Sequence, residues 1–272
     1  MLYTVVTVCR NALEDFEKTV KSVLSQTCTD YEYVVIDGAS TDGTAQSAAE
    51  YKKGFDKKGI PCTVVSEKDT GIYNAMNKAI DKSNGKWLIF MNAGDIFYSD
   101  EVLCEMAPYC TDGYDVVYAD TVAFEHGMYK IYKASEDISL LRDHWCMGHQ
   151  SIFTSSELMK KYHYDENYKI CADYDFYLKA LDNGAAFRYV NRFVSEINMY
   201  GVSIASYAAS TTENFRVLLA HGCITEDRFE KELAAIEAEA LSRKKKAPFR
   251  KFIPEFAFRL KRKREGWTAV RP

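Results

Sequence analysis

The sequence predicts an α/β fold in which helices flank a mostly parallel sheet and a helical extension follows at the C-terminal end. Short apolar runs alternate with amphipathic stretches through the N-terminal third of the chain, and these patterns indicate strands and helices. The strand-like runs are apolar at nearly every position, which is typical of parallel strands covered on both faces. With 47% hydrophobic and 14% aromatic residues among 272, the chain is excluded from the disordered class.

Each expected element follows from its own local pattern. Strands that alternate with helices of about ten to fifteen residues form βαβ units, and ligands bind beyond the carboxyl ends of such strands. The residues that directly follow each strand are therefore the first candidates for function. Strands are expected at residues 3–8, 31–36, 62–65 and 87–91, and helices at residues 44–53 and 72–81 and along the apolar stripe of Phe16, Val20, Val23 and Leu24.

Carboxylates follow three of these four strands. Asp37 opens the turn at residues 37–44, Glu67 and Asp69 follow the third strand, and Asp95 ends the turn after the fourth. Acidic groups crowded at one sheet edge repel each other unless a cation or hydrogen-bond donors lie between them. A Mg²⁺ or Mn²⁺ ion carrying a phosphorylated ligand fits such oxygen ligands. Taken alone, the turn at 37–44 is equally well explained as a turn with a helix cap.

The net charge of −4 hides an uneven distribution. Residues 243–264 contain eleven Lys and Arg but only one acid, Glu255, and aromatic side chains are interleaved with them. We expect this basic tail to lie as an amphipathic helix on an anionic membrane surface, where each basic residue contributes about 1 kcal/mol. A solvated helix end is the simpler alternative. Nucleic acid is not expected as a partner, because the rest of the chain is acidic.

The sequence indicates neither export nor a membrane span. No apolar run approaches the ~18–20 residues that a membrane-spanning helix needs. Met1 leads directly into a strand-like run, without a basic region or a cleavage site. The eight cysteines are scattered without a C-x-x-C pair, which favours reduced thiols. The expected location is the cytoplasm, with the protein peripheral on the inner face of the cell membrane.

Four motifs at the strand ends resemble those of glycosyltransferase family 2. They are T-V-x-x-N at residues 7–11, VIDGASTDGT at 35–44, G-x-x-x-A-x-NKAI at 71–80 and GKWLIFMNAGD at 85–95. The resemblance covers residues 1–205 and implies the Rossmann-like GT-A fold, with a nucleotide-sugar-binding half at 1–95 and an acceptor half at 96–205. Residues 206–272 would then form the helical extension that includes the basic tail.

The resemblance also implies a donor site at the strand ends. The base of a nucleotide sugar would lie against the first strand and be held by Asp37. A divalent metal, Mn²⁺ or Mg²⁺, would bridge the two phosphates of the donor and be ligated by Asp95. The implied donor contacts are Thr7, Val8, Asn11, Asp37, Glu67, Asp69, Gly71, Asn92 and Ala93.

A catalytic carboxylate is implied further along the chain. Asp173 matches the second residue of the family's Glu-Asp motif, at the start of an expected helix. An inverting transfer needs one carboxylate that deprotonates the acceptor hydroxyl, and a helix start keeps a carboxylate anionic. The alternative is that Asp173 only caps this helix. His149 and Gln150, expected just before another helix, are weaker candidates for contacts with the acceptor.

The sequence departs from the family pattern at four acidic positions. Asn92 and Gly94 replace two acids of the metal-binding motif, Gly38 replaces the second Asp of the usual Asp-Asp-Gly-Ser run, and Ala172 replaces the Glu before the catalytic Asp. Our interpretation is an inverting, metal-dependent transferase of hexosyl or N-acetylhexosaminyl groups. It would move the sugar from a UDP-sugar to a glycan or a polyprenyl-diphosphate-linked acceptor in cell-surface polysaccharide synthesis. The alternative is a catalytically silent protein that binds nucleotide sugars or glycans.

Overall fold

The N-terminal part of the chain alternates strands with helices, as the sequence predicts. In the computed structural model, which describes residues 1–198, 207–246 and 261–272, the observed elements start and end within a few residues of the expected ones. They are β1 (Tyr3–Cys9), α1 (Leu13–Leu24), β2 (Tyr31–Asp37), α2 (Thr44–Lys57), β3 (Cys62–Ser66), α3 (Ile72–Lys82) and β4 (Trp87–Phe90).

The following part of the chain contains shorter and more varied elements. In order they are β5 (Ile96–Phe97), α4 (Val102–Met106), β6 (Val116–Glu125), β7 (Met128–Tyr132), the 3-10 turns η1 (Ile138–Arg142) and η2 (His149–Ser151), β8 (Ile152–Ser155), α5 (Ser156–Tyr162), α6 (Ala172–Asp182) and β9 (Phe187–Asn198). The helix expected directly after His149 is preceded by strand β8, because residues 152–155 extend the sheet beside β4 and β6. Two helices, α8 (Tyr207–Ala220) and α9 (Glu226–Lys246), follow.

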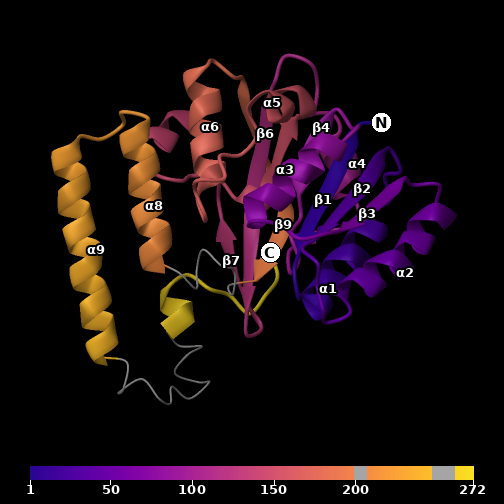
Figure 1. Cartoon of the computed structure of the whole chain (residues 1–272), viewed down its shortest axis with the longest axis horizontal. Helices are drawn as coiled ribbons and strands as arrows, with labels where there is room; N and C mark the ends of the chain where they lie inside the picture. Colours follow the sequence, from indigo (N-terminus) through magenta and orange to yellow (C-terminus); the bar gives the residue numbers. More distant parts are fainter. Residues whose placement is uncertain (199–206, 247–260) are drawn as a thin grey trace.

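One sheet runs through the whole molecule (Figure 1). Its strand order is β3-β2-β1-β4-β8-β6-β9-β5, and β7 pairs with β6. The block formed by β3, β2, β1 and β4 is entirely parallel, which confirms the predicted βαβ arrangement. Beyond β4 the sheet is mixed, because β8 is antiparallel to both of its neighbours while β6 and β9 are parallel.

Helices cover both faces of the parallel block, which explains why β1 and β2 are buried along their full length. On one face, Phe16 and Val20 of α1 and Phe55 of α2 pack with residues of α4. On the other face, Met76 and Ile80 of α3 pack with residues of α5 and α6. Side chains of each strand alternate between these two apolar clusters, as expected for a pleated strand.

The register of the parallel strands brings their carboxyl ends to one edge. Cys9 at the end of β1 lies beside Asp37 at the end of β2, and Asp37 lies beside Ser66 at the end of β3. On the other side of β1, Val6 is level with Phe90 at the end of β4. The four turns that follow these strands therefore start next to one another.

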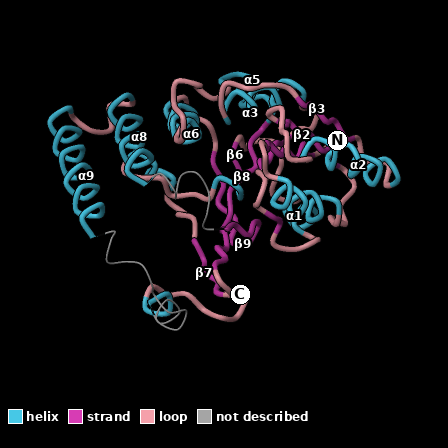
Figure 2. Tube along the Cα trace, turned by 60° about the horizontal axis from the view of Figure 1, so that its bottom comes forward, coloured by secondary structure: helices cyan, strands magenta, loops and turns pink. Residues whose placement is uncertain are grey.

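Helices α8 and α9 lie beside α6, with α9 outermost (Figures 1 and 2). Thr225 accepts a hydrogen bond from the backbone N–H of Arg228 and so caps the start of α9. Phe229, Leu233 and Ile236 are half-buried along the side of α9 that contacts α8. None of the helices in the described ranges is long and apolar enough to cross a lipid bilayer.

The last residues of the chain return to the sheet. Trp267 is buried against Ala123, Met128 and Ile197, and the backbones of Tyr129 and Thr268 exchange two hydrogen bonds of 2.7 and 2.8 Å. Figure 1 shows the C-terminus beside β7 and β9. The end of the chain is therefore held on the domain.

This docking changes the expectation for the basic tail. Arg262 lies within the segment predicted to contact a membrane, but its guanidinium pairs with Glu125 at the end of β6 and lies over the ring of Trp267. Arg271 likewise pairs with Glu196, with the atoms 3.0 Å apart. Residues 247–260 of the tail lie outside the described residues.

A half-buried histidine directly after α8 joins that helix to α6. His221 Nε2 lies 3.0 Å from an oxygen of Asp175 and its Nδ1 lies 2.9 Å from an oxygen of Asp182. The hydrogen bond with Asp175 raises the pKa of His221 above its ordinary value, although burial opposes the shift. Burial also opposes ionisation of Asp175, but the hydrogen bond with His221 and the charge of Lys179 hold the pKa of Asp175 below its ordinary value.

We predict that His221→Asn destabilises the fold by about 1–3 kcal/mol at pH 6 and by less at pH 9. A histidine with a raised pKa stabilises the folded state fully below its unfolded pKa of about 6.5, and the contribution is lost as the pH rises through the folded value. Thermal unfolding at both pH values measures the difference. His144→Asn, which changes an exposed histidine, is the control, and an equal loss at pH 6 and pH 9 in His221→Asn contradicts the account.

Candidate active site

The four turns at the sheet edge are bonded to one another. The backbone N–H of Gly38 donates to the carbonyl of Cys9, and the N–H of Glu67 donates to the carbonyl of Asp37. Asn11, after β1, accepts a hydrogen bond of 2.9 Å from the N–H of Thr41, after β2. These hydrogen bonds hold the turns after β1, β2 and β3 against one another at the edge where the sequence predicts the donor site.

The carboxylate of Asp37 is fully buried, and both of its oxygens accept hydrogen bonds from other residues of the protein. It accepts hydrogen bonds from the backbone N–H of Ser40 at 3.0 Å, from the hydroxyl of Ser40 and from the hydroxyl of Ser66 at 2.5 Å. Asp37 therefore fixes the shape of the turns after β2 and β3. Its contact with a donor base stays a prediction.

Thr7 and Val8 lie near the end of β1, and their side chains face the interior of the protein. Both are buried, and the Thr7 hydroxyl donates to the carbonyl of Met91 while accepting from Tyr33. Their side chains thus position the ends of β1 and β4, and the contact of Thr7 and Val8 with a donor stays a prediction. Asn11 lies at the exposed end of the same strand.

The turn after β3 carries two acidic groups, each held by one partner. Glu67 pairs with Lys78 of α3 at 2.8 Å. Asp69 accepts a hydrogen bond of 3.1 Å from the backbone N–H of Gly71 through one oxygen, which closes the turn directly before α3. The three residues predicted to approach the donor, Glu67, Asp69 and Gly71, therefore lie together.

A buried threonine of α1, Thr19, holds the turn after β4 in place. The Thr19 hydroxyl donates to the carbonyl of Asp95 at 2.7 Å and accepts from the backbone N–H of Gly94 at 3.0 Å. The N–H of Asp95 also donates to the carbonyl of Asn92, which closes the turn around Ala93. Thr19 is a site-forming residue that the sequence analysis missed, because in the sequence it belongs only to an amphipathic helix.

Asp95 is buried, and Gln150 Nε2 donates to one of its oxygens at 3.0 Å. Burial raises the pKa of Asp95 to about 7, and the hydrogen bond from Gln150 and the nearby His149 act in the opposite direction. The side-chain oxygen Oδ1 of Asn92 is also buried and has no hydrogen-bond partner among the described residues. The turn therefore holds two oxygen atoms suited to a hard cation.

A second carboxylate lies at the start of α6. Asp173 Oδ1 accepts a hydrogen bond of 3.1 Å from the hydroxyl of Tyr73, and Oδ2 lies 3.2 Å from His149 Nδ1. The residue in the N-cap position is Cys171, so the alternative that Asp173 is simply the cap does not describe its role. Burial, together with the charge of Asp173, raises the pKa of Tyr73 well above its ordinary value, so its hydroxyl remains a donor.

His149 and Gln150 connect the two carboxylates. Gln150 binds Asp95, while His149 contacts Asp173 and stacks on the ring of Phe90 with centroids 5.8 Å apart. Neighbouring residues of one short turn thus reach both acidic groups. The expected acceptor contacts of His149 and Gln150 stay predictions, but their contacts with Asp173 and Asp95 were not foreseen from the sequence.

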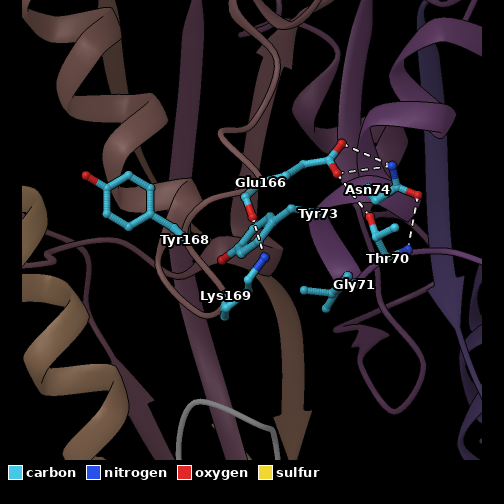
Figure 3. Close-up of a pocket in the computed structure, with 8 residues that line it drawn as sticks. Thr70, Gly71, Tyr73, Asn74, Glu166, Tyr168 and Lys169 are labelled. Carbon is cyan, nitrogen blue, oxygen red and sulfur yellow. Dashed lines mark hydrogen bonds between the residues drawn. The ribbon is translucent and has the colours of Figure 1, made fainter.

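A small pocket opens beside Tyr73. Figure 3 shows Glu166, from the loop before α6, reaching Asn74 of α3 and Thr70. Burial opposes ionisation of Glu166, but hydrogen bonds from Asn74, Asn77 and Thr70 hold the pKa of Glu166 below its ordinary value. The pocket is lined by Thr70, Gly71, Ile72, Tyr73, Asn74, Glu166, Tyr168 and Lys169.

One residue of the helical extension supports the site without being part of it. Glu213 of α8 accepts hydrogen bonds from three consecutive backbone N–H groups, those of Lys169, Ile170 and Cys171, at 2.7–2.8 Å. These residues lead directly into α6 and Asp173. Glu213 therefore fixes where the helix that carries Asp173 begins.

We predict that Glu213→Ala lowers stability by about 1–3 kcal/mol, because it leaves three backbone donors without an acceptor. Asp173 is the predicted catalytic base, so its displacement by about 1 Å would lower turnover by up to ~100-fold. Thermal unfolding and release of the nucleotide from a nucleotide sugar measure the two effects. Glu213→Gln, which keeps one acceptor oxygen, should lie between the alanine variant and the wild type, and Glu230→Ala on α9 is the control. An unchanged melting temperature in Glu213→Ala contradicts the role.

Known proteins share both the sequence pattern and the architecture. A PGL/p-HBAD biosynthesis glycosyltransferase of Mycobacterium bovis is 30% identical over 184 residues, which cover 66% of this chain and 70% of that protein. The putative teichuronic acid biosynthesis glycosyltransferase TuaG of Bacillus subtilis is 32% identical over 101 residues, 37% of this chain and 39% of that protein.

Two solved structures have the same fold at low sequence identity. S. aureus TarS 1-349 in complex with UDP-GlcNAc has a TM-score of 0.65 at 16% identity, over 93% of this chain and 77% of that one. The mannosyltransferase PcManGT from Pyrobaculum calidifontis, in complex with GDP-Man and Mn²⁺, has a TM-score of 0.63 at 16% identity, over 87% and 68%. These similarities establish the GT-A fold. The model of the family described as Glycosyl transferase family 2 matches residues 4–178, and the chain belongs to this family.

Proposed function

We propose that the protein transfers a hexosyl or N-acetylhexosaminyl group, with inversion, from a nucleoside diphosphate sugar to a hydroxyl group of a glycan or a lipid-linked glycan. The observation that carries the proposal is the pair of carboxylates joined through one short turn. Asp95 is contacted by Gln150 and Asp173 by His149, so one acid lies at the end of β4 and the other at the start of α6. A donor diphosphate and an attacking hydroxyl need separate partners of this kind.

Asp173 is the proposed general base. Its carboxylate remains partly accessible, at 18%, and is held by Tyr73 on one side and His149 on the other. In this assignment Asp173 takes the proton of the acceptor hydroxyl while that oxygen attacks the anomeric carbon from the side opposite the departing diphosphate.

A divalent cation fits the turn after β4 as a partner of the donor diphosphate. The turn offers the carboxylate of Asp95 and the unpartnered oxygen of Asn92. In the described part of the chain, no group of three or more acidic, histidine or cysteine side chains could hold an ion alone. We therefore propose that Mn²⁺ or Mg²⁺ arrives with the diphosphate, whose oxygens complete its coordination. When bound, such an ion stabilises negative charge on the leaving nucleotide.

Two of the missing acids are explained by the local structure, which is compatible with an enzyme. Gly94 has a φ of +102°, a conformation that an acidic residue adopts only with strain. Ala172, the first residue of α6, is fully buried, and an ionised side chain would be costly there. Both departures follow from local packing, while Asp95 and Asp173 are retained. This favours the enzyme over a catalytically silent binding protein.

Names of relatives suggest the acceptor class. The proteins from M. bovis and B. subtilis carry names that refer to PGL/p-HBAD and teichuronic acid biosynthesis, respectively. We propose an acceptor of the same broad kind, a cell-surface glycolipid or a polymer precursor on a polyprenyl diphosphate carrier. Such acceptors are made at the cytoplasmic face of the membrane, so we propose that the protein works there as a peripheral enzyme.

The basic tail is the proposed membrane contact. Residues 243–251 contain Lys and Arg at six positions, with no acidic residue. Helix α9 leads into this segment, and beyond it Arg262 and Trp267 are held on the domain. Contact of the segment with lipid would keep the enzyme close to the membrane surface.

A pair of variants tests the two carboxylates against each other. We predict that Asp173→Asn abolishes sugar transfer and donor hydrolysis but keeps binding of the nucleotide with Mn²⁺. Asp95→Ala should lose the Mn²⁺-dependent part of nucleotide binding, because it removes the one carboxylate of the turn. Isothermal titration with UDP and GDP, with and without Mn²⁺, measures binding, and nucleotide release measures turnover. Wild-type turnover by Asp173→Asn contradicts the base assignment, and unchanged metal dependence in Asp95→Ala contradicts the metal site.

The tail is tested by charge neutralisation, because deletion would also remove Trp267. We predict that replacing Lys244, Lys245, Lys246, Arg250 and Lys251 with Gln releases the protein from anionic vesicles while donor hydrolysis persists. Each residue contributes about 1 kcal/mol to such binding. The control replaces five exposed lysines elsewhere, Lys18, Lys53, Lys57, Lys82 and Lys86. Equal sedimentation of both variants with the vesicles contradicts the tail assignment.

A further inference from the structure

The carboxylate of Asp69 occupies the space that a side chain on residue 38 would fill. A Cβ atom built on Gly38 would lie 2.3 Å from Asp69 Oδ2, much closer than two such atoms can approach. Residue 38 is the position where the sequence lacks the second acid of the family pattern. An acidic group is therefore present at this position, but it comes from the turn after β3 and not from the end of β2.

The two carboxylates nearest to this point differ in availability. Asp37 is fully buried and accepts hydrogen bonds from Ser40 and Ser66. Asp69 is only half-buried, and its Oδ1 is fixed by the backbone N–H of Gly71. No described residue donates a hydrogen bond to Asp69 Oδ2. Asp69 thus provides an oriented acceptor that the protein itself does not use.

A positive side chain borders the same space. The Cδ and Cβ atoms of Arg10 lie 3.2 and 3.3 Å from the position of a Cβ on Gly38. Arg10 is exposed and forms no ion pair with any residue in the described ranges. A carboxylate oxygen of Asp69 and the aliphatic stem of the cationic Arg10 side chain therefore flank one point at the ends of β1, β2 and β3.

We propose that Asp69, in place of the fully hydrogen-bonded Asp37, is the residue that reads the base of the nucleotide donor, with Arg10 beside it. The proposal rests on the proposed function, since it assigns the base subsite of the same donor. An ionised carboxylate only accepts hydrogen bonds, so it fits a ring N–H group. Uracil and guanine present a ring N–H next to a carbonyl oxygen, which suits a carboxylate beside a guanidinium.

The same chemistry disfavours the other two common bases, whose amino group is the only hydrogen-bond donor at that edge. Cytosine and adenine present an unprotonated ring nitrogen at that position, and its lone pair would face the carboxylate of Asp69. A site built to accept a hydrogen bond rejects an analogue that lacks the donor much more strongly than a shape mismatch does. The assignment therefore predicts that UDP or GDP binds well and that CDP and ADP bind poorly.

The specific test is which nucleoside diphosphate the variant Asp69→Asn prefers to bind. An amide both donates and accepts, so the side chain of this variant can pair with cytosine as well as with uracil. We expect the affinity for the preferred nucleotide, UDP or GDP, to fall about tenfold or more, and the preference over CDP to collapse. Titration calorimetry with UDP, GDP, CDP and ADP measures all four affinities. Asp112→Asn, which removes an exposed acid from a distant turn, should leave the preference unchanged.

A double-mutant cycle tests the geometry itself. Gly38→Ala should weaken binding of the preferred nucleotide about tenfold, because the new methyl group displaces the carboxylate of Asp69. In the Asp69→Ala background the same substitution should cost much less, since the clashing oxygen is absent. Strong non-additivity supports the pairing of residues 38 and 69. Additive effects, with all variants folded by thermal unfolding, overturn it.

The outcomes separate this assignment from the proposed function. If the wild type binds UDP or GDP and Asp69→Asn keeps the wild-type preference over CDP, the base assignment is overturned and the transferase proposal stands. If the wild type binds none of the four nucleotides, both are overturned. A collapsed preference in Asp69→Asn alone, with the control unaffected, supports the assignment.

Discussion

The parallel register of β1 against β2 and β4 is the constraint on which the candidate site depends. Because β1 lies level with both neighbours, the turns that follow these strands begin at one edge of the sheet. Backbone groups at that edge bond to one another directly, as between Gly38 and Cys9 and between Glu67 and Asp37. A one-residue slip of β2 would turn Asp37 to the opposite face and dissolve this arrangement.

The second half of the molecule is fixed on this edge by a few polar contacts over long distances in sequence. Tyr73 of α3 donates to Asp173, and Gln150 donates to Asp95. Each contact joins the nucleotide half to the acceptor half through a group proposed to act in the reaction. Glu213 adds a third connection, from α8 to the start of α6. A displacement of α3, of the turn that carries Gln150 or of α8 would therefore move Asp95 or Asp173.

The sequence predicted the elements of the parallel block well, because burial on both faces and helical periodicity are local signals. It also placed Asp37, Asp69 and Asp95 at one edge, since the ends of parallel strands share that edge. It could not reveal Thr19, Tyr73 or Glu213 as supporting residues, because their partners lie 42 to 100 positions away. The docked C-terminus was missed for a similar reason. Charge pattern alone does not distinguish an arginine that faces lipid from one that pairs with an acid of the sheet.

The central claim is that the strand ends and the start of α6 form one transfer site. A crystal structure of the protein with UDP or GDP and Mn²⁺ tests it most directly. The account predicts that the diphosphate and the ion lie at the turn from Asn92 to Asp95, with the base between Arg10 and Asp69 and with Asp173 facing the space beyond the second phosphate. A nucleotide bound away from the ends of β1 to β4, or an ion ligated without Asp95, would contradict the claim.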